Sequence, residues 1–192
     1  MNNFITNFGE DTSLATRLKK LIPVCVDLKF LIGFFYFSGW REIYTNLQNN
    51  SQTSLKILVG LQVDKHLSKM VELDNIEDGL SNEEQFTHFV QSLGNAVNNA
   101  EMDNEEFYGQ VEFFLDMLEQ GRLIIKKTRH PNHAKLYLFV LNDEINKGLN
   151  IAGEFITGSS NLTTAGLRGQ QEFNVEIRDY GFAEANQYYE DL

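Results

Sequence analysis

The chain has 192 residues, of which 42% are hydrophobic, and a formal net charge of -11 at pH 7. This length suits one globular domain over residues 1–192, and no apolar run reaches the roughly 20 residues that a membrane-spanning helix needs. The first residues lack the basic region and apolar core of a signal peptide, and the chain has one cysteine, Cys25. These features favour a cytoplasmic protein without a membrane partner, with Cys25 as a small core side chain.

The negative charge lies mainly in one segment. Residues 62–120 contain 14 acidic and only two basic residues, which leaves the rest of the chain with a balance of +1. Within that near-neutral part, the stretch from Lys126 to Lys135 has four basic side chains, two histidines and no acidic residue. Salt screens charges beyond about 8–10 Å, so this stretch can attract a phosphate despite a distant acidic surface.

The first elements in chain order are a helix and a β-α-β unit. Thr12 or Ser13 can cap the helix, which stops near Pro23. The residues after Lys29 are almost all apolar, as is typical of a strand covered on both faces. The unit is expected as a strand over 29–37, a helix over 39–48 and a strand over 55–60.

The acidic segment is expected to be helical. It reads as helices over 63–73, 82–98 and 105–119, with apolar residues on one face of the third and solvated charged faces. Because strands resume directly afterwards, we interpret residues 62–120 as an insertion in one domain. The later elements are expected as strands over 122–128, 134–141, 150–157 and 172–178, and a helix that begins near Phe182. This order of strands and helices predicts an α/β fold.

A group of polar residues follows in the C-terminal third. His133 and Lys135 are two residues apart at the head of an apolar strand, so their side chains are expected on the same face. The stretch Gly158-Ser159-Ser160-Asn161 then ends the next strand, where small residues let backbone N–H groups approach an anion. Glu172 follows on the strand after that. Together these residues supply a nucleophile, phosphate ligands and an acid that can orient the imidazole.

This pattern resembles the half-site motif of the phospholipase D superfamily, which is H-x-K, a spacer, G-S-x-N and then a glutamate. The matching residues are His133, Lys135, Gly158, Ser159, Asn161 and Glu172. The wider sequence is similar to the phospholipase D-like domains found beside bacterial helicases and in restriction-type nucleases. The resemblance implies a phospholipase D-like mixed β-sheet flanked by helices, with the acidic segment as a helical insertion.

The resemblance also implies phosphodiester cleavage without a metal or other cofactor. His133 would act as nucleophile or general acid through a phosphohistidine. Lys135 and Asn161, with Gly158 and Ser159, would bind the phosphate oxygens, and Glu172 would accept a hydrogen bond from the far imidazole nitrogen. One motif supplies half of a site, so the resemblance implies a homodimer with the active site at its interface.

The family often has an aspartate five residues after the lysine, but this chain has Val140 there, so Asp143 is considered as a replacement. A metal site at His130 and His133 is disfavoured, because no cysteine or third histidine lies near in sequence. The aromatic run Phe34 to Phe37 is expected in the core, with Trp40 a candidate for base stacking.

Three functions remain open at this point. The first is a phosphodiesterase for nucleic acid, DNA above all: a restriction or repair nuclease, or the N-terminal domain of a longer helicase. Its binding residues would be Lys126, Lys127, Arg129 and His130. The second is a noncatalytic module for nucleic-acid binding or dimerisation. The third is a phosphodiesterase for lipids or small diesters, which is disfavoured because the sequence has no basic amphipathic helix.

Overall fold

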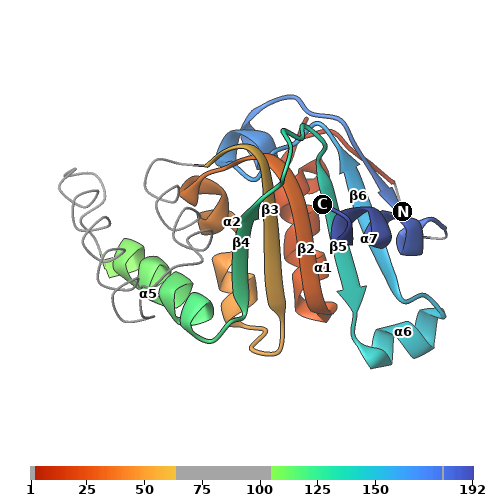
Figure 1. Cartoon of the computed structure of the whole chain (residues 1–192), viewed down its shortest axis with the longest axis horizontal. Coiled ribbons are helices and arrows are strands. Elements are labelled where there is room, and N and C mark those ends of the chain that lie inside the picture. Colours follow the sequence, from red (N-terminus) through yellow and green to blue (C-terminus); the bar gives the residue numbers. More distant parts are fainter. Residues whose placement is uncertain (1–2, 64–104, 179) are drawn as a thin grey trace.

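The computed structural model describes residues 3–178, except 64–104, and residues 180–192 (Figure 1). Within these residues a seven-stranded mixed sheet has the order β1-β7-β6-β5-β2-β3-β4. The strands are β1 (Phe4–Ile5), β2 (Cys25–Phe35), β3 (Ser54–Val63), β4 (Leu123–Lys127), β5 (Leu136–Leu141), β6 (Gly153–Gly158) and β7 (Asn174–Ile177). The α-helices are α1 (Leu14–Leu21), α2 (Phe37–Gln48), α5 (Glu105–Glu119), α6 (Asp143–Leu149) and α7 (Phe182–Glu190). The expected mixed sheet flanked by helices is confirmed.

The sheet has a parallel and an antiparallel part. β2, β3 and β4 are parallel neighbours, and α2 connects β2 to β3, which confirms the β-α-β unit. α5 precedes β4 with the expected bounds and packs against α2. The remaining pairs, from β2 to β5 and onward to β1, are antiparallel.

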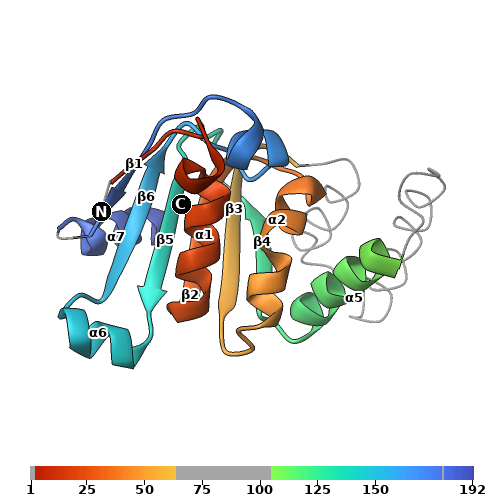
Figure 2. The ribbon, with the colours of Figure 1, turned by 180° about the vertical axis from the view of Figure 1, so that it is seen from behind.

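The main core lies on the sheet face that α1 and α2 cover, which faces the viewer in Figure 2. Ser13 caps α1 by accepting a hydrogen bond from the Thr16 N–H, as the sequence predicts. Trp40 is fully buried there and meets Phe114 edge to face at a centroid distance of 4.9 Å. The expectation that Trp40 is a candidate for base stacking is therefore wrong, because its ring packs between helices.

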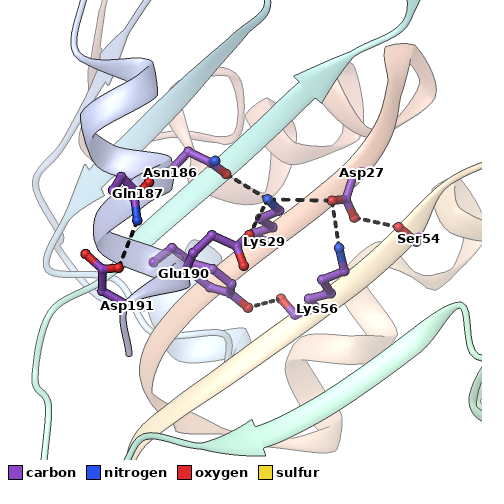
Figure 3. Close-up of polar contacts among 9 residues, drawn as sticks. Asp27, Lys29, Ser54, Lys56, Asn186, Gln187, Glu190 and Asp191 are labelled. Atoms are coloured by element: carbon purple, nitrogen blue, oxygen red, sulfur yellow. Dashed lines mark hydrogen bonds and ion pairs between the residues drawn. The ribbon is translucent and has the colours of Figure 1, made fainter.

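α7 covers part of the opposite face with a smaller apolar cluster and a polar contact (Figure 3). The buried ammonium of Lys29 lies 2.5 Å from Glu190 Oε1 and 2.7 Å from Asn186 Oδ1, both on α7. Asp27 lies beside Lys29 on β2 and pairs with Lys56 at 3.0 Å. Buried Lys29 thus attaches the last helix to the sheet through charge as well as apolar area.

Several boundaries differ from the sequence-based expectations. The strands expected from residues 134, 150 and 172 begin two or three residues later, and the strand expected from Lys29 begins earlier, at Cys25. The helix expected from Val63 does not begin there, because Val63 ends β3. The rest of that helix and the helix expected over 82–98 lie outside the described residues. The sequence patterns predict neither β1 nor α6. No helix in the described part of the chain has the length and hydropathy needed to cross a bilayer.

Candidate active site

The strand ends next to the expected half-site residues lie at one end of the sheet, at the top of Figure 1. β5 begins there at Leu136, which pairs with Thr157 near the end of β6. Gly158 at the end of β6 pairs with Asn174 at the start of β7. The segments before β5, after β6 and before β7 therefore lie side by side, although up to about 40 residues separate them in sequence.

His133 and Lys135 precede β5 and contact each other. The Lys135 ammonium lies 3.0 Å from His133 Nε2 and donates a 2.7 Å hydrogen bond to the His133 carbonyl. An ammonium can only donate, so the imidazole accepts at Nε2 and holds its proton on Nδ1. His133 is exposed, whereas Lys135 is buried. Burial lowers the pKa of Lys135 from its usual value, and the Glu172 carboxylate partly opposes this shift.

The Gly158–Ser159 turn is locked to the segment before β7. A Cβ at position 158 would lie 2.3 Å from the Phe173 carbonyl oxygen, so only glycine allows this approach. The Ser159 N–H donates to that carbonyl at 3.2 Å, and the Ser159 hydroxyl donates to the Glu172 carboxylate. Ser159 and Glu172 are thus brought together as a direct hydrogen-bonded pair.

Asn161 is held by the other half of the sheet. Its side-chain oxygen accepts hydrogen bonds of 3.0 Å from the backbone N–H groups of both Gly33 and Phe34. The register between β2 and β3 shifts between Ile32 and Phe34, and this irregularity frees the two donors to point at one acceptor. The carboxamide nitrogen of Asn161 has no partner among the described residues. The bonds therefore fix which end of the amide remains available to an anion.

Sequence reasoning missed the role of Asn174. Its amide donates a 2.9 Å hydrogen bond to the Ser160 hydroxyl and accepts one of 3.2 Å from the Ser160 N–H. The Tyr137 hydroxyl donates to the Ser160 carbonyl at 2.9 Å, and all three residues are fully buried. Strand alternation puts Asn174 on the same face as Glu172, but nothing in the sequence indicates Ser160 as its partner. Asn174 and Tyr137 hold the turn that carries Ser159 and Asn161.

One expected hydrogen bond and one considered replacement are not seen. Among the residues that the structure describes, the His133 ring forms a hydrogen bond with Lys135 alone, and the expected hydrogen bond to Glu172, whose Oε2 accepts from Ser159, is not formed. Asp143 does not replace the family acid, because it begins α6 at the far end of β5 from His133. Val140 is half-buried near that same end of β5.

The expected nucleic-acid ligands occupy the same end of the sheet but a different strand. Lys126 and Lys127 end β4, and Arg129 and His130 follow in the loop; all four are exposed. β2 and β3 separate β4 from β5. The structure thus keeps them apart from His133 while aligning them along one edge. Searched across the described ranges, no group of three or more His, Cys, Asp or Glu side chains could hold a metal ion.

The loop between β4 and β5 crosses the end region of β3. The Asn132 N–H donates a 3.1 Å hydrogen bond to the Gly60 carbonyl, and a Cβ at position 60 would lie 1.8 Å from the Asn132 carbonyl oxygen. The Asn132 side chain also accepts from the Ala134 N–H at 2.8 Å and donates to the Tyr188 hydroxyl at 3.1 Å. These contacts fix the backbone directly before and after His133.

A second charged cluster lies deeper, between β6, β7 and α1. The buried Glu176 carboxylate accepts from Arg17 Nε at 2.6 Å and from Arg178 Nη2 at 2.6 Å. Glu154 is buried beside it and lies 3.1 Å from Arg178 Nε. Burial, and secondly the Glu176 carboxylate, raises the pKa of Glu154 to about 7, while Arg17 opposes the shift. This cluster supports the strands below the half-site.

Comparison with solved structures shows what fold this geometry belongs to. NucT from Helicobacter pylori matches 100% of this chain and 94% of its own, at a TM-score of 0.49 and 11% identity. Nuc from Salmonella typhimurium, a phospholipase D family member, matches 98% of this chain and 90% of its own, at 0.45 and 10%. Phosphatidylserine synthase from Haemophilus influenzae matches 98% of this chain and 37% of its own, at 0.50 and 16%. The chain has a phospholipase D-like fold.

The phospholipase D-like fold confirms what the motif implies about architecture. No family model matches the sequence, and no curated protein matches it. The similarity is therefore one of structure, at sequence identities of 10–16%. In this phospholipase D-like chain, the residues of the expected half-site converge on one end of the sheet.

Proposed function

We propose that this chain is a phosphodiesterase that cleaves nucleic acid, DNA above all, without a metal. The observation that carries the proposal is the convergence of three groups at one sheet end. These are the His133–Lys135 pair, the Ser159 hydroxyl and the amide of Asn161, whose orientation the β2 backbone fixes. They combine a nucleophile with a cation and neutral donors for phosphate oxygens.

The first chemical step uses His133 as the nucleophile. Nε2 of the neutral imidazole gives up its hydrogen bond with Lys135 and attacks phosphorus, a P–N bond forms, and the P–O bond to the leaving group breaks. His133 of a second copy of the chain donates the proton that the leaving oxygen takes up. Lys135 already lies 3.0 Å from Nε2, so a phosphate that reaches this nitrogen can also accept from the ammonium. The Asn161 amide offsets the charge that builds on the other oxygens, and the Ser159 hydroxyl joins it when its proton turns from Glu172 to the phosphate.

The second step returns the enzyme to its first state. Water attacks the phosphohistidine, its proton passes to the second copy's imidazole, and the P–N bond breaks. The proton on Nδ1 of His133 needs an acceptor while the ring carries positive charge. We assign this role to Glu172, whose Oε1 has no partner among the described residues, while its Oε2 holds Ser159.

This mechanism needs two histidines, and one chain supplies one motif. We therefore propose a homodimer in which a twofold axis places two His133 residues at one phosphate. The exposure of His133 at the sheet end is compatible with this arrangement. The exposed basic residues at the end of β4 support nucleic acid as the substrate, because phosphate contacts dominate affinity for it. Attachment to a helicase domain is part of the same proposal.

The first test is hydrolysis in excess EDTA. Single-stranded DNA, double-stranded DNA and bis(p-nitrophenyl) phosphate are offered to the unaltered chain, to His133→Ala and to His130→Ala. His130 is an exposed histidine three residues away, so its variant is a matched control. Cleavage that survives EDTA and is lost only in His133→Ala supports the proposal. No cleavage by any chain would instead favour a noncatalytic binding module.

The second test addresses the homodimer. Unaltered chains are mixed with an excess of His133→Ala chains and allowed to exchange. If each site needs two copies of His133, mixed dimers are inactive and activity falls more steeply than the fraction of unaltered chains. A linear fall would show that each chain acts alone.

A further inference from the structure

Two exposed phenylalanines lie beside the half-site. Phe173 is 56% exposed and Phe4 is 51% exposed, and their ring centroids are 5.4 Å apart with the planes tilted by 31°. Phe4 belongs to β1, which pairs with β7 directly after Phe173. The pair forms an exposed apolar platform, whereas six of the other phenylalanines in the described part of the chain are buried and Phe8 is also exposed. Large aromatic surface exposed at one place marks a contact site.

The platform is rigidly connected to the phosphate-binding turn. The Phe173 N–H donates to the Ser159 hydroxyl at 3.1 Å, and the Ser159 N–H donates to the Phe173 carbonyl at 3.2 Å. The same hydroxyl donates to Glu172, the residue before Phe173. The backbone that carries the ring is therefore bonded to groups that would bind the phosphate. A phosphate at Ser159 would bring the adjoining parts of its own molecule to the platform.

The order of the strands determines on which side of His133 the aromatic platform lies. Along the sheet end, the exposed basic residues follow β4, His133 precedes β5, and Phe173 precedes β7. Neighbouring strands are about 4.8 Å apart, so β5 and β7 are separated by roughly 10 Å and β5 and β4 by roughly 14 Å. Cations thus lie to one side of the reacting position and aromatic rings to the other. Proteins that bind single strands combine these two elements.

We propose that Phe173 and Phe4 stack on an unpaired base about one or two nucleotides from the reacting phosphate, so that the substrate is single-stranded nucleic acid. This inference rests on the proposed function, and it narrows the substrate class. A paired base has its faces covered by its neighbours, whereas an unpaired base can offer one face to the rings. Stacking tolerates any base, so the platform selects the strand state and leaves the sequence free.

The test measures stacking directly. Binding of a short single-stranded oligonucleotide that contains 2-aminopurine is followed by its fluorescence, in chains that also carry His133→Ala to prevent cleavage. Stacking quenches this base, so the unaltered platform should quench it and Phe173→Ala should not. Phe173→Ala should also weaken binding roughly 5- to 150-fold, the loss expected for one stacked base.

Three further variants separate stacking from other roles of the ring. Phe173→Trp keeps an aromatic face and should bind as tightly as the original, whereas Phe173→Leu keeps only apolar bulk and should behave like Phe173→Ala. Tyr180→Ala is the matched control, because Tyr180 is 74% exposed beyond the far end of β7. It should leave quenching and affinity unchanged. Tight binding by Phe173→Leu would contradict stacking.

An oligonucleotide with abasic sites distinguishes this inference from the proposed function. The chain that keeps both phenylalanines should bind the abasic strand more weakly than the base-containing strand, by the same factor by which Phe173→Ala weakens binding. Equal binding of both strands overturns the platform, while His133-dependent cleavage of the abasic strand still supports the phosphodiesterase. Absence of any binding overturns both proposals. A shift from dimer to monomer in Phe173→Ala, measured by light scattering, would make the rings a contact between copies and also overturn the platform.

Discussion

The side-chain oxygen of Asn161 accepts a 3.0 Å hydrogen bond from the backbone N–H of Phe34, and the neighbouring Gly33 N–H donates to the same atom. Asn161→Asp keeps this acceptor but replaces the available amide nitrogen with a negatively charged oxygen. We expect an unchanged fold, because both backbone donors keep their partner, and at least about 100-fold slower phosphodiester cleavage, the cost of removing one oxyanion donor. Circular dichroism and turnover measure the two. Asn49→Asp, at an exposed position, is the control, and unchanged turnover in Asn161→Asp would count against the role of this amide.

Asn174 should prove to be a stabilising residue of the site. Asn174→Ala removes two buried hydrogen bonds to Ser160 and leaves its N–H and hydroxyl without those partners. We expect a loss of about 1–3 kcal/mol in the free energy of unfolding, measured by urea titration. Asn46→Ala, which loses one exposed hydrogen bond to Lys19, should cost much less. A cost equal to that of the control would show that the turn does not depend on Asn174.

We expect the buried Lys135 ammonium to lower the stability of the folded state. Burial disfavours its charged form, so the lowered pKa means that the ammonium destabilises the folded state at pH values below that pKa. We expect Lys135→Met to raise the melting temperature at pH 7 while abolishing cleavage, and this gain should shrink as the pH rises from the lowered pKa of Lys135 toward the usual 10.5. Lys126→Met, at an exposed position, should change the melting temperature little. A lower melting temperature in Lys135→Met would mean that its hydrogen bonds to His133 outweigh the burial.

Glu154 should make stability depend on pH. Its pKa is raised from 4.5 to about 7, so its contribution is fully present below about pH 4.5 and is lost as the pH rises through 7. Glu154→Gln resembles the protonated carboxyl, and we expect it to raise the melting temperature at pH 8 by roughly 2–8 °C and to flatten the pH dependence between pH 5 and 8. Glu184→Gln, at an exposed position on α7, is the control. If the melting temperature of Glu154→Gln depended on pH as steeply as that of the unaltered chain, another group would be responsible for the pH dependence.

The sequence predicts the motif residues better than it predicts the residues that hold them in place. The motif residues could be found because their order along the chain carries the information, and strand alternation places them at element ends. The late start of β5 has a local cause: β5 can pair only from Leu136 onward, where Leu31 and Thr157 face it. A strand pattern shows where apolar residues are, but not where the partner strand stops offering hydrogen bonds.

Other features depend on contacts that no local pattern contains. Glu154 and Glu176 look like outward-facing acids of two strands, yet both are buried, and Arg17, which neutralises Glu176, is 159 residues away in sequence. α6 is different, because its signals are local: Asn142 caps it and acidic residues fill its first turn. A closer reading could have found α6, whereas β1 has only two residues and depends on its pairing with β7.

The close approach of the Asn132 backbone to Gly60 affects how variants at position 60 should be interpreted. Any side chain at position 60 must displace the backbone that precedes His133, since even a Cβ would overlap the Asn132 carbonyl. A saturation mutagenesis scan scored by activity should therefore group Gly60 with the motif residues, although it contributes no chemical group. Variants there would be classed by motif inspection as harmless changes in a distant strand. Searches for inactive natural versions of this protein should check position 60 before accepting an intact motif as a sign of activity.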